Sequence, residues 1–312
     1  MTWSYPTITA QIAPKDTLND YVLPTSPCHH WYECILSSLL SIRAAELTLL
    51  HSFTRTLLPT RSLTNLPPGA NFTPTIHTDT YADISPSTKS DLTGRAVFIS
   101  GASRGIGRAT ALSYARAGAA QIAVAAPNGL DNIEQEILAA ASSMKREPPQ
   151  TLVLELNVLD LASVKAAAQK TEHCFGKLDI LINNAGYLEK GIPIAESDPD
   201  DYWKTWEINY RGLYWMTRAF LPLLLRSGDL RTIVNLSSMG ALSLRPGGSA
   251  YQTSKFAILK FTEFVMTEYA EQGVLCYAVH PGGVMTELAS NMPTETHSGM
   301  LFRICVAWTR RG

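Results

Sequence analysis

From Leu92 onward, short runs rich in apolar and β-branched residues alternate with longer segments in which apolar residues recur at helical spacing. The first of these runs, Ala-Val-Phe-Ile-Ser, is almost continuously apolar, which is typical of a strand covered by helices on both faces. The pattern therefore predicts an α/β fold, a doubly wound parallel sheet of the Rossmann type, over residues 92–312. Its six strands are expected at Arg95–Ser100, Gln121–Ala126, Thr151–Asn157, Leu178–Ala185, Arg231–Ser238 and Val274–Pro281.

Residues 1–91 have a different pattern. They hold half of the 18 prolines but only one of the 20 glycines, and from Leu58 to Ser90 they show no lasting periodicity. We interpret them as a partly irregular N-terminal extension with one short amphipathic helix between Cys34 and Leu50. That helix is too short to span a bilayer. As a device for binding a membrane surface or a partner it would lack a basic face, because Arg43 and Glu46 are its only charges.

Composition and charge narrow the class of partner. The net charge is −1 and the isoelectric point is about 6.7, so the chain lacks the basic excess of nucleic-acid-binding proteins, and we expect a small-molecule partner. The five cysteines include no Cys-x-x-Cys pair, which argues against a zinc site or a disulfide framework. No histidine has companion ligands at metal spacing, so no metal site is expected. With no secretory signal pattern at the N-terminus, the prediction is a cytoplasmic protein without a transmembrane segment.

A glycine-rich loop follows the first predicted strand. The segment Ser100–Gly107 places glycines at 101, 105 and 107 between that strand and a helical pattern. Glycine allows positive φ in a tight turn and removes the Cβ that would keep a pyrophosphate from the N–H groups of the helix N-terminus. The strand-turn-helix setting predicts a dinucleotide site, and a glycine turn without a ligand is the alternative.

The end of the second predicted strand bears on the choice of dinucleotide. NAD-preferring folds carry an Asp or Glu there to hold the ribose 2′-hydroxyl, but here the strand runs into Ala126-Pro127-Asn128. Arg104 in the glycine loop is available to pair with a 2′-phosphate. The pattern therefore favours NADP, with NAD as a second possibility. The alternative interpretation of Arg104 is a solvated surface charge.

Candidate catalytic groups lie further along the chain. Tyr251 and Lys255 are four residues apart in a long helical pattern, so they share one helix face. The ammonium is expected to lower the pKa of the phenol toward 7 and to bind the nicotinamide ribose. Ser238 ends the fifth predicted strand thirteen residues before the tyrosine. The Tyr-Lys spacing alone arises often by chance, and taken singly Ser238 could cap a strand end and Tyr251 could be a packing residue.

The combination of motifs resembles the short-chain dehydrogenase/reductase family. The matching residues are the glycine loop, Asn183-Asn-Ala-Gly186, Asn209, Ser238, Tyr251, Lys255 and Pro281-Gly-Gly-Val-Met-Thr286, in the family's order over residues 92–286. The resemblance implies that Ser238 binds the substrate oxygen, that Tyr251 gives or takes its proton, and that Asn209 holds a water linking Lys255 to solvent. The implied cofactor contacts are Gly101, Ser103, Arg104, Gly105, Ile106, Gly107, Asn157, Asn183, Ala185, Gly186, Tyr251, Lys255, Val284 and Thr286.

Several of these residues have structural alternatives. Asn183 and Asn184 could tie neighbouring strands together, as buried amides often do. Asn209 could be an ordinary helix residue. The family usually has Asp-Val where this chain has Asn157-Val158, which alters the expected adenine contact, although an amide can still donate and accept there.

The C-terminal part departs further from the family pattern. Only 26 residues follow Thr286, and we expect a lid to begin at Ala289 but no final strand in Leu301–Gly312. A missing strand would expose a sheet edge and remove surface for dimer contacts, so a homo-oligomer is an open question.

The expected function is an NADP-dependent oxidoreductase. It would move a hydride between the nicotinamide and the carbonyl or secondary alcohol of a small organic substrate, such as a secondary metabolite, with Tyr251 as the proton donor in reduction. The alternative is a dinucleotide-binding sensor or scaffold, inactive because of the shortened C-terminus.

Overall fold

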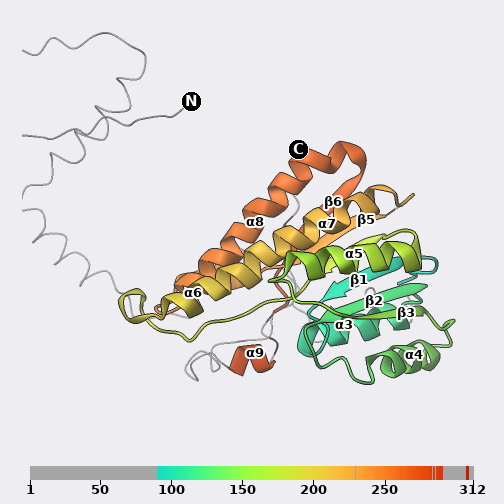
Figure 1. Cartoon of the computed structure of the whole chain (residues 1–312), viewed down its shortest axis with the longest axis horizontal. Coiled ribbons are helices and arrows are strands. Elements are labelled where there is room, and N and C mark those ends of the chain that lie inside the picture. The colour runs from blue at the N-terminus through green and yellow to red at the C-terminus, as the bar shows by residue number, and fades with distance from the viewer. Residues whose placement is uncertain (1–89, 229, 283, 285, 291–306, 309–312) are drawn as a thin grey trace, which may run out of the picture. The chain divides into compact units, whose positions relative to one another are not determined.

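The computed structural model describes residues 90–228, 230–282, 284, 286–290 and 307–308 (Figure 1). They form a seven-stranded sheet in the order β3-β2-β1-β4-β5-β6-β7. The first six strands pair in parallel and β7 pairs antiparallel with β6. The strands are β1 (Ala96–Ser100), β2 (Gln121–Ala126), β3 (Gln150–Glu155), β4 (Ile180–Asn183), β5 (Arg231–Leu236), β6 (Val274–Val279) and β7 (Ala307–Trp308).

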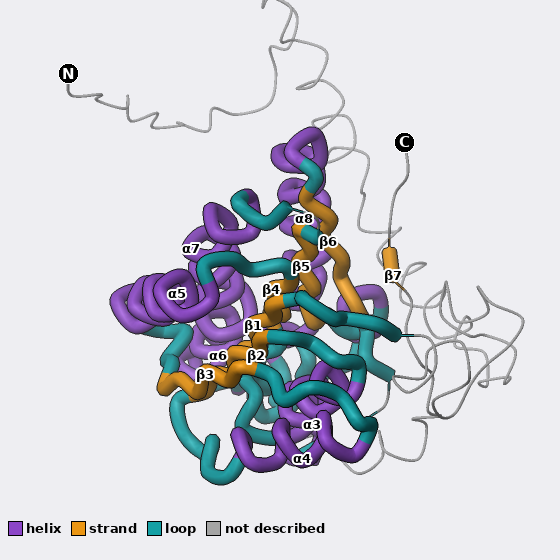
Figure 2. Tube along the Cα trace, turned by 90° about the vertical axis from the view of Figure 1, so that its right-hand side faces the viewer, coloured by secondary structure: helices purple, strands orange, loops and turns teal. Residues whose placement is uncertain are grey.

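Helices cover both faces of the sheet (Figure 2). They are α3 (Gly105–Arg116), α4 (Ile133–Ser143), α5 (Leu161–Phe175), α6 (Pro199–Trp206), α7 (Leu213–Leu225), α8 (Ser249–Tyr269) and the short α9 (Glu287–Ser290). Apolar residues of α3 and α4 pack with one face of the central strands. Those of α5, α7 and α8 pack with the other face. The sheet is therefore doubly wound, and because its strand order reverses between β1 and β4, ligand chemistry is expected beyond the carboxyl ends of these strands.

The predicted fold and the six predicted strands are confirmed, with shifts at strand ends. The main difference is β4, which spans Ile180–Asn183 rather than 178–185. At its amino end, the backbone of Asp179 still bonds to Ala96 of β1 (3.0 Å) and Thr232 of β5 (2.9 Å). At its carboxyl end, the N–H groups of Asn184 and Ala185 donate to the Ser100 hydroxyl, so a side-chain acceptor replaces the sheet partner there.

The C-terminal tail corrects one prediction. Leu301–Gly312 was expected to hold no strand, but Ala307 and Trp308 pair antiparallel with Val279 and Ala278 at the end of β6. A two-residue strand leaves no periodic pattern in the sequence, which is why the pattern missed it. The proposed lid beyond Ser290 lies outside the described residues, as do the extension up to residue 89 and its amphipathic helix.

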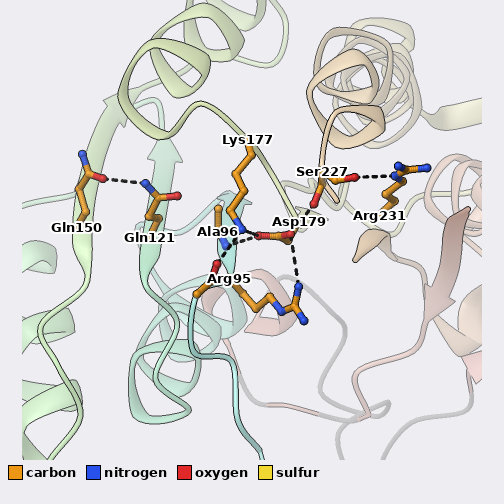
Figure 3. Close-up of polar contacts among 9 residues, drawn as sticks. Arg95, Ala96, Gln121, Gln150, Lys177, Asp179, Ser227 and Arg231 are labelled. Atoms are coloured by element: carbon orange, nitrogen blue, oxygen red, sulfur yellow. Dashed lines mark hydrogen bonds and ion pairs between the residues drawn. The ribbon is translucent and has the colours of Figure 1, made fainter. Parts of the chain in front are cut away.

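A buried carboxylate joins the amino-terminal ends of the central strands (Figure 3). Asp179, just before β4, is 1% exposed in its side chain. Its carboxylate accepts hydrogen bonds from the Ala96 N–H of β1, at 2.8 Å, and from the Ser227 hydroxyl. Lys177 Nζ lies 3.0 Å from the same group and Arg95 Nη1 lies 3.9 Å from it. The candidate site lies at the opposite, carboxyl-terminal ends of these strands.

Among the described residues, none of the helices combines the length and the apolar character of a membrane span. The same residues contain no group of three or more His, Cys, Asp or Glu side chains able to hold a metal ion.

Candidate active site

The glycine loop between β1 and α3 is a close-packed turn. Gly101 has φ +67°, and a Cβ there would lie 2.8 Å from the Ala185 Cα. A Cβ on Gly107 would meet the Gly101 carbonyl and would lie 2.5 Å from the Asn184 Nδ2. Asn184 in turn donates to the carbonyls of Ser100 (3.0 Å) and Gly101 (2.9 Å). The loop therefore leaves its backbone uncovered by side chains at the start of α3.

The N-terminus of α3 is suited to an anion. Its N-cap residue, Arg104, makes no side-chain hydrogen bond to the first turn, so the N–H groups there receive no acceptor from their own cap. Gly105, with φ +53°, begins the helix. Free N–H groups and the positive end of a helix favour a phosphate, so the loop fits the pyrophosphate of a dinucleotide.

The predicted cofactor residues around the loop lie at its rim. The Ser103 Cβ would be 3.4 Å from a Cβ on Gly129, in the turn after β2, where no carboxylate occurs between Ala126 and Gly129. Ile106 is half-buried in the first turn of α3. Asn157 is exposed just beyond β3, and its Oδ1 accepts the N–H of Leu159 at 3.0 Å, which closes a turn.

Arg104 has a partner that sequence reasoning did not predict. Its Nη1 lies 3.1 Å from Glu287 Oε2, and both side chains are mostly exposed. Glu287 begins α9, directly after Thr286, whose Cγ2 would lie 3.2 Å from a Cβ on Gly105. Val284 is partly exposed in the same segment. Thr286 therefore lies against the glycine loop, while the nicotinamide contacts that the resemblance implies for Val284 and Thr286 stay a prediction.

Asn183 takes the structural role that was weighed for it. Its side chain is buried and donates to Asn235 Oδ1 on β5 (2.9 Å) and to Thr217 Oγ1 on α7 (3.1 Å). Asn235 continues the chain of bonds by donating to Thr262 of α8 at 3.0 Å. The Asn183 Nδ2 group therefore ties β4 to β5 and α7, while its buried Oδ1 has no hydrogen-bond partner, and the predicted cofactor contact of Asn183 stays a prediction. Asn184 is the amide that contacts the glycine loop.

The three candidate catalytic side chains converge beyond β4 and β5. Lys255 and Tyr251 lie one turn apart on α8, with the Lys255 Nζ 5.6 Å from the centre of the Tyr251 ring. The Ser238 side chain forms a hydrogen bond with Tyr251. Lys255 is buried and donates to the Leu236 carbonyl at the end of β5, at 2.8 Å. The predicted Ser-Tyr-Lys cluster is thus present in space.

The pKa of the phenol differs from the sequence prediction. Burial raises the pKa of Tyr251 above its ordinary value, the Ser238 hydrogen bond and Arg245 oppose this effect, and Glu189 adds to it. The expectation that Lys255 brings this pKa toward 7 is therefore wrong for the protein as described. Burial penalises the phenolate more strongly than its neighbours stabilise it, and the lysine directs its ammonium to Leu236. Burial also lowers the pKa of Lys255, to about 8.

Asn209 lies in a π-helical segment, η3 (Glu207–Gly212), between α6 and α7. Its Oδ1 accepts the Tyr187 N–H (2.8 Å), while its Nδ2 donates to the Tyr187 carbonyl (2.9 Å) and to Ser254 of α8 (3.0 Å). A Cβ on Gly186 would lie 3.4 Å from Asn209 Oδ1 and 3.7 Å from Lys255 Nζ. Asn209 and Lys255 therefore flank the same glycine. Such π segments are often found at functional sites, and no sequence pattern pointed to this one.

Glu189 was missed by the sequence analysis. It is 7% exposed, in the loop that leaves β4, and its Oε1 accepts the backbone N–H of Tyr251 at 3.0 Å. In the sequence, a glutamate followed by Lys190 is expected to be exposed. Its burial depends on packing against elements that are distant in the sequence, so the sequence pattern does not show it.

The end of β4 links the two halves of the site. Ala185 lies against Gly101 of the glycine loop, and the next residue, Gly186, lies against the Lys255 ammonium. A dinucleotide held at the loop would therefore extend past Gly186 toward a buried amine, a phenol and a hydroxyl. Such a set of groups can bind a carbonyl oxygen and exchange a proton with it.

Comparisons with known proteins agree with this geometry. The sequence model of the short chain dehydrogenase family matches residues 95–297. "Short chain dehydrogenase mpl6" from Monascus purpureus is 53% identical over 237 residues, which are 75% of this chain and 80% of that protein.

Two solved structures similar to this chain contain cofactors. A short chain dehydrogenase from Shigella flexneri 2a, complexed with NADP, superposes with a TM-score of 0.59 at 30% identity, covering 68% of this chain and 87% of the other. A 3-ketoacyl-(acyl-carrier-protein) reductase from Brucella melitensis, complexed with NADH, gives 0.58 at 26% identity, covering 67% and 84%.

Proposed function

Because this chain belongs to the short-chain dehydrogenase/reductase family, whose members are oxidoreductases that bind a nicotinamide dinucleotide, we propose that it interconverts a ketone and a secondary alcohol on a small organic molecule. The observation that carries the proposal is the convergence of Ser238, Tyr251 and Lys255 beyond the sheet, next to the β4 end that touches the glycine loop. A cytoplasmic location is part of the proposal and rests on the cysteine pattern.

The residues of this chain would meet the cofactor at four places. The Gly101–Gly107 cradle and the uncapped start of α3 would hold the pyrophosphate, Asn157 would lie near the adenine, and Thr286 would close over the loop. Lys255 would bind the nicotinamide ribose. When bound, the nicotinamide supplies a hydride to the carbonyl carbon, or accepts one in oxidation.

The protein side chains handle the oxygen and its proton. The Ser238 hydroxyl would bind the substrate carbonyl oxygen and hold it toward the phenol. Tyr251 would donate its proton to that oxygen in reduction and would take it back in oxidation. The buried Lys255 would stabilise the phenolate that remains. Asn209, next to Gly186 and the lysine, would help to return the proton.

We further propose that NADP is preferred. No carboxylate that could repel a 2′-phosphate occurs between Ala126 and Gly129, directly after β2, and Arg104 lies at the rim of the loop. The Glu287 carboxylate that pairs with Arg104 would have to give way to the phosphate, which bears more charge. The ratio of kcat/KM for NADPH and NADH tests this preference directly.

Tyr251→Phe tests the proposed reaction. Loss of the proton donor should lower kcat for ketone reduction by about 100-fold or more, while NADPH binding, followed by its fluorescence, stays close to wild type. Tyr214→Phe, which removes a hydroxyl from a partly exposed tyrosine on α7, is the matched control and should retain full activity.

Two outcomes would contradict the proposal. Turnover that survives Tyr251→Phe would remove the phenol from the chemistry. Wild-type protein that binds NADPH but consumes none across a panel of ketones and alcohols would favour a sensor or scaffold instead.

A further inference from the structure

Glu189 supplies a cap that helix α8 lacks. The N-cap of α8 is Gly248, which has no side chain to accept a first-turn N–H group. The Glu189 Oε1 accepts the N–H of Tyr251 at 3.0 Å, and its Oε2 accepts the Thr205 hydroxyl of α6 at 3.2 Å. A carboxylate at a helix N-terminus is stabilised by the free N–H groups and by the helix dipole. The residue that it fixes is the proposed proton donor itself.

The loop that carries Glu189 is held on both sides of it. Before it, both backbone polar groups of Tyr187 bond to the Asn209 amide. After it, Gly191 packs so closely against Gly247, which has φ +74°, that a Cβ on Gly247 would lie 2.5 Å from the Gly191 carbonyl carbon. The loop 187–192 is therefore anchored at both ends, by Asn209 before Glu189 and by Gly247, next to the start of α8, after it.

Glu189 also affects the Tyr251 phenol through its charge. The charged groups around it are Glu189 from this loop, Arg245 from the turn before α8, and Lys255 from α8 itself. The Glu189 carboxylate raises the pKa of Tyr251 and Arg245 lowers it. Beyond Glu189, Lys190 and Asp201 line a cavity of about 400 Å³ that the glutamate also borders.

We propose that Glu189 is a positioning residue for Tyr251: its carboxylate fixes the first turn of α8 so that the phenol meets Ser238. The inference rests on the proposed function and adds a residue that acts through Tyr251 rather than by touching the substrate. It assigns the loop after β4 a share in holding the proposed proton donor in place.

Glu189→Gln separates charge from position. The amide oxygen can still accept the Tyr251 N–H, but the negative charge is gone, so the phenol should ionise more easily. We expect the pH profile of alcohol oxidation to move to lower pH, with the rate below the wild-type optimum rising about threefold or more. In reduction, the loss of rate at high pH should begin at lower pH. Glu189→Ala also removes the acceptor, and should lower kcat about tenfold with little change in KM for NADPH.

Glu196→Gln is the matched control, because it makes the same chemical change at an exposed position in the same connection. Its pH profile should coincide with that of the wild type. A Glu189→Gln profile that also coincides with the wild type would overturn the role of the charge. An unchanged kcat in Glu189→Ala would overturn the role in positioning. If Glu189→Ala does not fold, the Glu189→Gln profile still decides.

A second measurement needs no substrate. Tyrosines absorb more strongly in the near ultraviolet when they ionise. Subtracting the pH titration of a Tyr251→Phe variant from that of the same protein with Tyr251 leaves the absorbance change of Tyr251 alone. In Glu189→Gln this phenolate should form at lower pH than in the wild type, and equal titrations would contradict the inference. Because the titration does not depend on turnover, a wild-type protein without activity would refute the proposed function alone.

Discussion

At the scale of one residue, burial of the Lys255 ammonium in the site lowers the stability of the folded protein. Its side chain is buried, with the Leu236 carbonyl as its hydrogen-bond acceptor, and burial lowers its pKa from the ordinary 10.5 to about 8. The folded protein therefore binds this proton less tightly than the unfolded chain does. The corresponding cost is about 3 kcal/mol, fully present below pH 8 and relieved as the pH rises from there toward 10.5.

Lys255→Met should therefore stabilise the protein while abolishing turnover. At neutral pH we expect the free energy of unfolding to rise by about 1–2 kcal/mol, since the variant loses the buried charge but leaves the Leu236 carbonyl without its donor. The gain should shrink as the pH rises from about 8 toward 10.5, where the wild-type lysine is neutral in the fold. Urea unfolding at a series of pH values measures both.

The comparison for this variant is Lys260→Met, on the same helix but 66% exposed in its side chain. Its unfolding free energy should stay within about 0.5 kcal/mol of the wild type. A stabilisation by Lys255→Met that grows as the pH is raised would be the opposite of the expected sign.

At the scale of elements, the turn from β1 into α3 depends on the absence of side chains. Gly107→Ala would place a methyl group against the Gly101 carbonyl and the Asn184 amide. The loop would have to open, so NADPH binding should weaken about 100-fold, with a smaller loss of stability. Fluorescence titration with NADPH measures the affinity and thermal unfolding the stability.

Gly228→Ala is the control for that substitution. A Cβ there meets nothing within 4 Å, and its backbone does not have positive φ. It should leave NADPH affinity unchanged. Equal affinities for Gly107→Ala and the wild type would show that the pyrophosphate is not held by this turn.

The elements also show where sequence reasoning succeeds. The central strands β1, β2 and β4 could be predicted because they are buried on both faces and therefore almost wholly apolar. The glycine loop and the Tyr251–Lys255 pair could be found because each lies within one short segment. Glu189 and the π segment around Asn209 could not be found in this way, since each depends on contacts with elements distant in the sequence.

At the scale of the whole described domain, Asp179 ties the sheet together at the end opposite the active site. The carboxylate binds the start of β1, the serine before β5 and a lysine beside β4. Asp179→Asn keeps the shape but removes the charge that Lys177 and Arg95 face. We expect the free energy of unfolding to fall by about 2–4 kcal/mol, with kcat unchanged in the protein that remains folded.

Denaturant unfolding and active-site titration with NADPH test this expectation together. Asp131→Asn, at an exposed position after β2, is the comparison and should change stability by about 0.5 kcal/mol or less. A loss of kcat per folded molecule in Asp179→Asn would mean that the two ends of the sheet are not independent.

The anchoring of loop 187–192 has a consequence for how this protein can diverge. Its Tyr187 is bonded to Asn209 and its Gly191 is wedged against Gly247, so an inserted or deleted residue would shift the phenol from the serine. New substrates would therefore have to be accommodated by point substitutions here, while changes of length fall on other connections.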